Sequence, residues 1–99
     1  MSVMPNRMRH KFRLYVADGA ANSLLAIANL EAFCGEHLPH SSEISVLDVF
    51  KQPERALADS VMMTPMLIKL APGPVVRIVG TLSNAETLLH ALGLQVRAA

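Results

Sequence analysis

The chain of 99 residues is long enough for one domain with a real core, because a chain of this size buries roughly two-thirds of its unfolded surface. Its composition, 52% hydrophobic and 17% charged, excludes a disordered protein, and its net charge of +1 gives no strong field to attract nucleic acid or a membrane surface. The single cysteine, Cys34, excludes an intramolecular disulfide and fits a reducing compartment. We therefore expect a cytoplasmic globular protein with neither nucleic acid nor membrane among its partners.

The first half of the chain predicts a strand, a helix and a second strand. Residues 1–10 are expected to form a flexible tail and residues 11–99 a single domain. Residues 11–17 and 43–49 have strand composition, and a helix capped by Asn22 or Ser23 is expected between them, from about Leu24 to His37. Its predicted buried stripe follows helical spacing: Leu24, Ile27, Leu30, Cys34 and Leu38. Strand, helix and strand at this spacing form a right-handed βαβ unit.

The second half predicts a short helix, a hairpin and a last helix. Pro53 opens the short helix, which continues to about Ser60. Two apolar strands, residues 66–70 and 75–79, are joined by the turn Pro72-Gly73-Pro74, which cannot lie inside either strand. Residues 83–86 read as a capping box, in which Ser83 caps the last helix and Gly93 ends it.

The resulting order, β-α-β-α-β-β-α, is satisfied by a thioredoxin-like fold with a mixed four-stranded sheet. In this arrangement the proline before the third strand is characteristically cis, so we predict a cis peptide between Thr64 and Pro65.

The residues predict no enzyme, no cofactor and no metal site. A thioredoxin-like reductase needs a Cys-x-x-Cys pair after the first strand, but residues 18–23 contain no thiol. Cys34 lies on the predicted buried stripe, so a redox protein that uses Cys34 alone is kept only as an alternative. His37 and His40 have no third metal ligand nearby in the sequence, and their ordinary interpretation is as exposed polar residues.

Several short motifs resemble, in order and spacing, the KaiB circadian clock proteins. They are Leu14-Tyr15-Val16-Ala17, Asn22-Ser23, Asp48-Val49 with Lys51 and Pro53, Thr64-Pro65-Met66-Leu67, Pro72 and Pro74 with Arg77-Ile78-Val79-Gly80, and Leu82-Ser83. The similarity runs from about Lys11 to Leu94, which is nearly the whole chain.

The resemblance implies a non-catalytic protein-binding regulator. KaiB-like proteins bind the ring-shaped ATPase and kinase KaiC, oppose KaiA and compete with a sensor histidine kinase whose N-terminal domain is KaiB-like. Two further readings stay open: a KaiB-like adaptor for another partner in stress or sensor-kinase signalling, and a purely structural oligomer.

The resemblance also places a partner-binding surface on the first helix and the second strand. Its predicted residues are Asn22, Ser23, Leu25, Ala28 and Ser45. The family commonly has basic residues where this chain has Leu25, Ala28 and Ser45, so we expect binding here to depend less on salt than electrostatically steered association does.

KaiB-like proteins are also known for two folds, a tetrameric ground state and a thioredoxin-like monomer that differ in the second half. The residues assigned to this fold switch are Thr64, Pro65, Pro72, Gly73, Pro74, Arg77 and Gly80. Local signals favour the thioredoxin-like arrangement, because the turn at residues 72–74 resists helix formation and residues 83–86 are expected to cap a helix. The ground-state fold and a homo-oligomer, dimer or tetramer, are the alternatives.

Overall fold

A computed structural model describes residues 9–94 of the chain. Its elements, in order, are β1 (His10–Val16), α1 (Ala21–His37), β2 (Ser42–Asp48), α2 (Pro53–Ala58), β3 (Met66–Ala71), β4 (Val76–Val79) and α3 (Ala85–Ala91). This order confirms the predicted succession of strands and helices. β1 begins at His10, the last residue that the sequence assigned to the N-terminal tail, and residues 1–8 lie outside the described range.

The strands form one mixed sheet in the order β2-β1-β3-β4. β1 runs parallel to β2 and antiparallel to β3, and β3 and β4 form an antiparallel hairpin. The parallel pair requires a crossover, which α1 provides. β1 is therefore an inner strand with a partner on each side, whereas β2 and β4 are the edges of the sheet.

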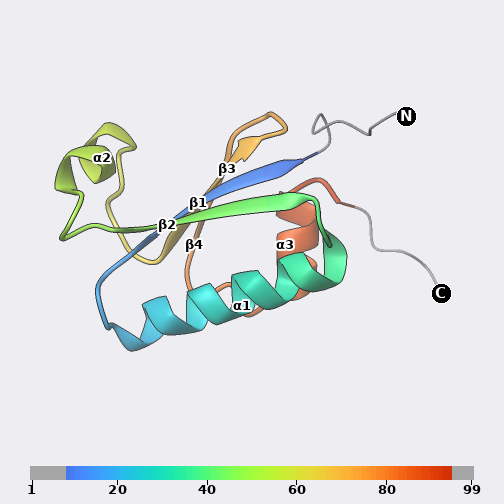
Figure 1. Ribbon diagram of the computed structural model, residues 1–99, viewed down its shortest axis with the longest axis horizontal. Helices are drawn as coiled ribbons and strands as arrows, with labels where there is room; N and C mark the ends of the chain where they lie inside the picture. Colours follow the sequence, from blue (N-terminus) through green and yellow to red (C-terminus); the bar gives the residue numbers. More distant parts are fainter. Residues whose placement is uncertain (1–8, 95–99) are drawn as a thin grey trace.

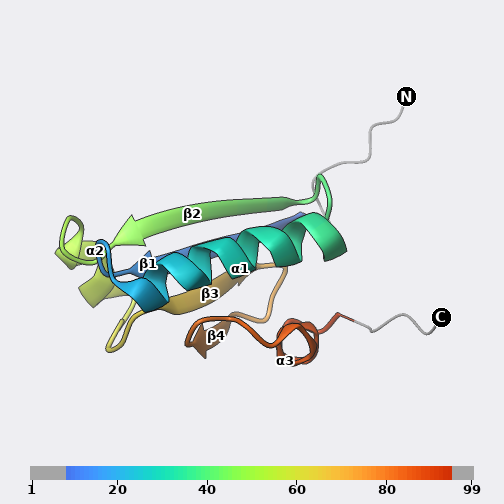
Figure 2. The same ribbon diagram turned by 90° about the horizontal axis from the view of Figure 1, so that it is seen from below.

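The two faces of the sheet are covered unequally. α1 and α3 lie together against one face, and the short α2 lies beyond one end of the strands on the other side (Figures 1 and 2). The main core lies under α1 and α3, where alternate residues of β1 and Leu67 of β3 meet apolar residues of the helices. Its members include Phe12, Leu14, Val16, Leu30, Phe33, Leu67, Leu88 and Leu89. A smaller cluster on the opposite face contains Tyr15, Leu47, Ala56, Met66 and Ile68.

The buried face of α1 differs from the predicted stripe. Leu24 was expected in the core but is 58% exposed, whereas Ser23, Ala26 and Phe33 are buried. The helix starts at Ala21, and the residues that face inward near its N-terminus are the small Ser23 and Ala26. The prediction relied on large apolar residues at helical spacing, and it therefore assigned the wrong side of the first helical turn to the core. Leu30, Cys34 and Leu38 are buried as predicted.

Two predicted helix caps are also corrected. The residue before α1 is Ala20, whose side chain makes no capping hydrogen bond, so neither Asn22 nor Ser23 caps this helix. α3 is capped by Asn84 rather than Ser83: the Asn84 side-chain oxygen accepts a hydrogen bond of 3.0 Å from the Thr87 backbone N–H. Asparagine is among the strongest N-cap residues because it satisfies one otherwise unpaired backbone donor.

The hairpin follows the prediction closely. The Thr64–Pro65 peptide is cis, as predicted, and the Ala71–Pro72 and Gly73–Pro74 peptides are cis as well. The turn over residues 72–74 separates β3 from β4, and the helical conformation of residues 85–91 belongs to the thioredoxin-like arrangement that the local signals favoured.

Within residues 9–94, none of the helices combines the length and apolar character needed to cross a membrane.

Candidate functional site

The outer face of α1 presents three of the five residues predicted to contact a partner. Asn22, Leu25 and Ala28 are exposed, and Leu25 has 51% of its surface accessible to solvent. Leu24, beside it in the chain, is exposed too, so two neighbouring leucines project from the first turn of α1. A single exposed leucine is ordinary, but two in succession give this turn an apolar surface that a partner could cover.

Ser23 is placed inside the fold rather than on this surface. Its side chain is only 2% exposed, and its hydroxyl oxygen accepts a hydrogen bond of 3.0 Å from the Ala17 backbone N–H. This bond satisfies a donor at the point where the chain leaves β1, so Ser23 ties the start of α1 to the end of β1. In this structure Ser23 therefore has a structural position and is not available to a partner.

Ser45 is exposed but lies on a different side of the molecule. In the β1–β2 ladder Ser45 pairs with Arg13, and paired residues of neighbouring strands point to the same face. Arg13 reaches the end of α2, so Ser45 belongs to the face opposite α1, where it sits on the edge strand β2. The neighbouring Val46 pairs with Leu14 and is the half-exposed residue of β2 on the α1 side.

α1 is held in its orientation by a polar contact that the sequence did not reveal. The Asn29 side-chain amide donates a hydrogen bond of 2.9 Å to the Thr81 carbonyl oxygen, in the segment between β4 and α3. This bond lies on one flank of the helix and leaves its outer side turned to solvent. The presentation of Leu25 thus depends on contacts made by both halves of the chain.

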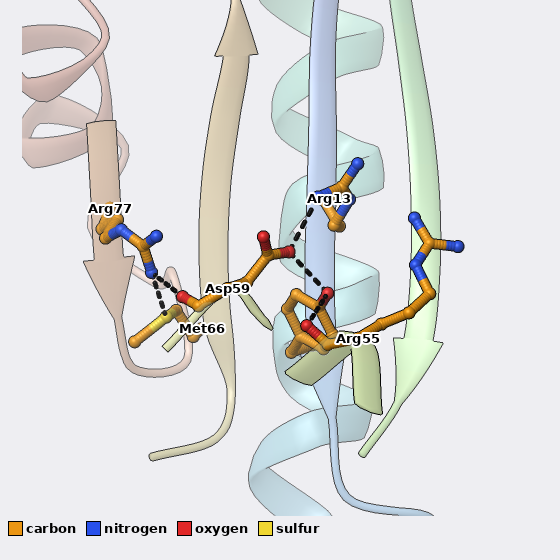
Figure 3. Close-up of polar contacts among 6 residues, drawn as sticks. Arg13, Arg55, Asp59, Met66 and Arg77 are labelled. Carbon is orange, nitrogen blue, oxygen red and sulfur yellow. Dashed lines mark hydrogen bonds and ion pairs between the residues drawn. The ribbon is translucent and has the colours of Figure 1, made fainter. Parts of the chain in front are cut away.

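A second group of side chains gathers on the sheet face opposite α1, around Asp59, the residue that directly follows α2. We call Arg13, Tyr15, Asp59 and Arg77 the Asp59 cluster. Figure 3 labels Arg13, Asp59 and Arg77. One carboxylate oxygen of Asp59 accepts hydrogen bonds from Arg13 Nη1 at 2.7 Å and from the buried Tyr15 hydroxyl at 2.5 Å. The Tyr15 hydroxyl also lies 3.2 Å from the Arg55 carbonyl oxygen. The cluster therefore fastens α2, which has little core of its own, to β1.

The charges of this cluster stabilise one another. Hydrogen bonding from Tyr15, and then from Arg13, lowers the pKa of Asp59 against the opposing effect of burial. Burial, followed by the hydrogen bond to Asp59, raises the pKa of Tyr15, while the bond to Asp59 raises the pKa of Arg13. At neutral pH the cluster thus holds an ionised carboxylate beside a charged guanidinium and a neutral phenol, which are hydrogen-bonded to one another.

Arg77, assigned from the sequence to the fold switch, joins the Asp59 cluster from β4. Its Nη1 donates a hydrogen bond to the Asp59 backbone carbonyl oxygen and lies 3.7 Å from the Met66 sulfur (Figure 3). A side chain of the last strand therefore reaches across β3 to the end of α2. Arg13 and Tyr15 are two residues apart in β1 and so share a face, but no local pattern in the sequence indicated that Asp59 would meet them.

The other residues assigned to the switch surround the hairpin. Pro65 is buried just before β3, and its carbonyl oxygen accepts a hydrogen bond of 3.0 Å from the Gly80 backbone N–H. Gly80 has φ = 122°, a conformation that only glycine adopts without strain, so the end of β4 requires glycine here. Thr64 precedes β3, and residues 72–74 form the turn at the far end of the strands.

No redox or metal chemistry is supported by the described residues. Cys34 is 4% exposed, and burial raises the pKa of its thiol, which disfavours the reactive thiolate. Across residues 9–94, no three histidine, cysteine, aspartate or glutamate side chains are placed to hold a metal ion together.

The comparisons with known proteins agree with this geometry. The KaiB domain family matches residues 13–94. The circadian clock protein KaiB3 of Synechocystis sp. is 42% identical over 90 residues, which cover 86% of this chain and 88% of that protein. The circadian clock oscillator protein KaiB of Thermostichus vulcanus is 38% identical, with 91% of this chain and 83% of that protein covered.

Among solved structures, the N-terminal domain of Synechococcus elongatus SasA superimposes with a TM-score of 0.73 at 19% identity, covering all of this chain and 97% of the domain. A thioredoxin of Fasciola hepatica gives a TM-score of 0.70 at 24% identity, with 89% and 82% covered. At these identities the two structures show the fold alone, which is thioredoxin-like. The family match over residues 13–94 and the two clock proteins of 42% and 38% identity establish that the chain belongs to the KaiB family.

Proposed function

We propose that this chain is a non-enzymatic regulator that binds a KaiC-like ATPase and kinase ring in circadian or related signalling control. The observation that supports this most is the match of the KaiB family to residues 13–94, which includes every strand and helix except the first residues of β1. The buried thiol and the structural character of the Asp59 cluster are consistent with a protein that acts through binding.

The contact surface that we propose is the outer side of α1, with Asn22, Leu25 and Ala28 at its centre and Leu24 at its margin. Large apolar side chains with half or more of their surface exposed are the groups that gain most when a partner excludes water from them. Ser45 stays in the proposal as a residue of the β2 edge, reached from the opposite face. Ser23 contributes by fixing the start of α1, through its bond to the Ala17 N–H.

The test is the affinity of the full chain for a KaiC-like ATPase from the same genome, measured by fluorescence anisotropy. Leu25→Glu should weaken binding by about 30-fold or more, the effect of truncating a hot-spot residue. The matched control is Leu57→Glu on α2, because Leu57 is 76% exposed and lies on another part of the molecule. Both variants should unfold at the same denaturant concentration as the natural chain.

Either of two results would contradict the proposed surface. The first is an affinity of Leu25→Glu equal to that of the natural chain, and the second is an equal loss in both glutamate variants. The salt dependence gives an independent check: between about 0.05 and 0.5 M salt, the affinity should change less than in a charge-steered complex.

The redox alternative is separated by a thiol test. Cys34→Ser should leave ATPase binding unchanged, since the side chain is buried against the core and away from the outer side of α1. A reductase or peroxidase assay of the natural chain should show no thiol-dependent turnover, and turnover that the serine variant loses would favour the redox protein instead.

A second candidate function is an adaptor for a different partner in stress or sensor-kinase signalling. The similarity of the fold to the SasA N-terminal domain motivates it, and at 19% identity that similarity concerns the fold alone. Adding the SasA domain to the anisotropy assay separates the two functions. Displacement of this chain from the ATPase by that domain would support a shared binding site, and so the ATPase regulator rather than the adaptor. We also propose a cytoplasmic location and a homo-oligomer, dimer or tetramer, which analytical ultracentrifugation would measure.

A further inference from the structure

A cavity of about 470 Å³ lies at the end of the sheet that holds the β3–β4 turn. Its walls come from three parts of the chain: the start of β1, the turn over residues 72–74 with the flanking strands, and the last turn of α3. The volume is in the range of sites that hold small organic molecules, about 300–1,000 Å³. None of the residues in the proposed partner surface on α1 lines it.

Lys69 of β3 is the side chain that distinguishes this cavity. It is 4% exposed, and in the sheet it pairs with Phe12 of β1 and Val76 of β4, so it points to the face that α1 and α3 cover. Throughout residues 9–94, its ammonium group has no hydrogen-bond acceptor and no carboxylate within ion-pair distance. The ammonium nitrogen itself keeps some contact with water. An anion in the cavity would give it a counter-charge beside apolar walls, where the attraction is stronger than in open water.

The rest of the lining favours the same kind of ligand. No aspartate or glutamate is among the described residues that form the walls, whereas His10 and His90 are. Leu92, Leu94 and Val76 supply apolar surface around the Lys69 ammonium. The charged head of a ligand would therefore meet Lys69 while its body meets aliphatic side chains.

We propose that this cavity binds a small organic carboxylate with an apolar body, through the Lys69 ammonium. A single negative charge fits better than a phosphate dianion, because the described walls contain no arginine. The helix end at the cavity is also the C-terminus of α3, which carries a partial negative charge. This inference goes beyond the proposed function and does not depend on it, since the cavity and the α1 surface share no residue.

The test uses hexanoate as the probe and hexanol as its uncharged match, each titrated into the isotope-labelled full chain and followed by proton–nitrogen NMR spectra. Hexanoate should shift the amide signals of Lys69, Gly73 and Gly93 in a saturable way. Its dissociation constant should be lower than that of hexanol by about ten-fold, equivalent to roughly 1.4 kcal/mol for the charged contact.

Two variants separate the charge from the cavity. Lys69→Met keeps the length and apolar character of the side chain, so it should remove the preference for hexanoate over hexanol. Ala91→Phe should fill the cavity from α3 and abolish binding of both probes, which keeps the proposal testable if the lysine variant does not fold. Lys11→Met is the matched control, because Lys11 is exposed and does not line the cavity.

The proposal is overturned if hexanoate binds the natural chain no more tightly than hexanol, or if its shifts do not saturate. It is equally overturned if Lys69→Met keeps the full preference, since the ammonium would then have no part in recognition. Inorganic phosphate that shifts the same amides with the affinity of hexanoate would overturn the assignment to an acid with an apolar body.

Discussion

Replacing Tyr15 by phenylalanine removes one hydrogen bond of the Asp59 cluster and leaves the ring in place. The lost hydroxyl is buried, and its acceptor is an ionised carboxylate at 2.5 Å whose side chain is 22% exposed. Hydrogen bonds to charged groups contribute about 1.5–3 kcal/mol; we take the lower end, about 1.5 kcal/mol, because Asp59 keeps some contact with water. For a chain of this length the Tm should then fall by about 6–12 °C.

The measurement is urea unfolding followed by circular dichroism, at one protein concentration so that assembly does not alter the comparison. The effect should also depend on pH. Because the pKa of Asp59 is lowered in the folded state, its carboxylate stabilises the fold above the unfolded-state pKa of about 4, and this contribution is lost as the pH falls through the lower folded value. The difference between Tyr15→Phe and the natural chain should therefore shrink below about pH 4.

Ser83→Ala is the control for this experiment, because it also removes one hydroxyl, but an exposed one whose contact with the Thr81 hydroxyl spans 3.3 Å. It should change the free energy of unfolding by no more than about 0.5 kcal/mol. If Tyr15→Phe is as stable as this control, or if its deficit is the same at all pH values, the Asp59 cluster does not hold α2 in the way we describe.

Two further predictions concern the backbone, and the same unfolding assay tests both. Asn84→Ala removes the cap of α3 and should lower the free energy of unfolding by about 1 kcal/mol; an unchanged value would mean that Asn84 is not the effective cap. Gly80→Ala should lower it by about 1–3 kcal/mol, because φ = 122° is strained for any residue with a Cβ atom. Gly35→Ala lies inside α1, where the added Cβ would meet no side chain or other segment within 4 Å, and it should raise the free energy of unfolding by about 0.5–1 kcal/mol. Equal stabilities of the two alanine variants would refute the conformational argument.

The sequence predicted the order of the elements because each has a local cause that it carries itself. Alternating side chains indicate β1, and the residues at 72–74 can only form a turn. The cis peptide before Pro65 followed from the fold class and is present. The sequence could not predict how closely each turn of a helix packs against the sheet. Leu24 was therefore expected in the core and Ser23 on the surface, the reverse of their positions.

The candidate site was predicted only in part, for a related reason. Exposure of Leu25 follows from its distance from the buried stripe, which is a local property. The side of the sheet to which Ser45 points depends on its pairing with Arg13, which is set by the register of two strands separated by a helix. Contacts such as those of Asp59 with β1 join residues more than 40 positions apart and leave no periodic pattern in the chain.

The single ladder between β1 and β3 has a mechanical consequence. β1, α1 and β2 form a continuous βαβ unit, to which β3 and β4 are joined by one ladder and by the bonds of the Asp59 cluster. α3 is attached through side-chain packing and the Asn29–Thr81 bond. Under denaturant or force, β4 and α3 should therefore unfold before the rest. Their amide protons should exchange first, and those of the β1–β2 ladder last. The outer side of α1 belongs to the β1-α1-β2 unit, which should stay folded while β4 and α3 unfold.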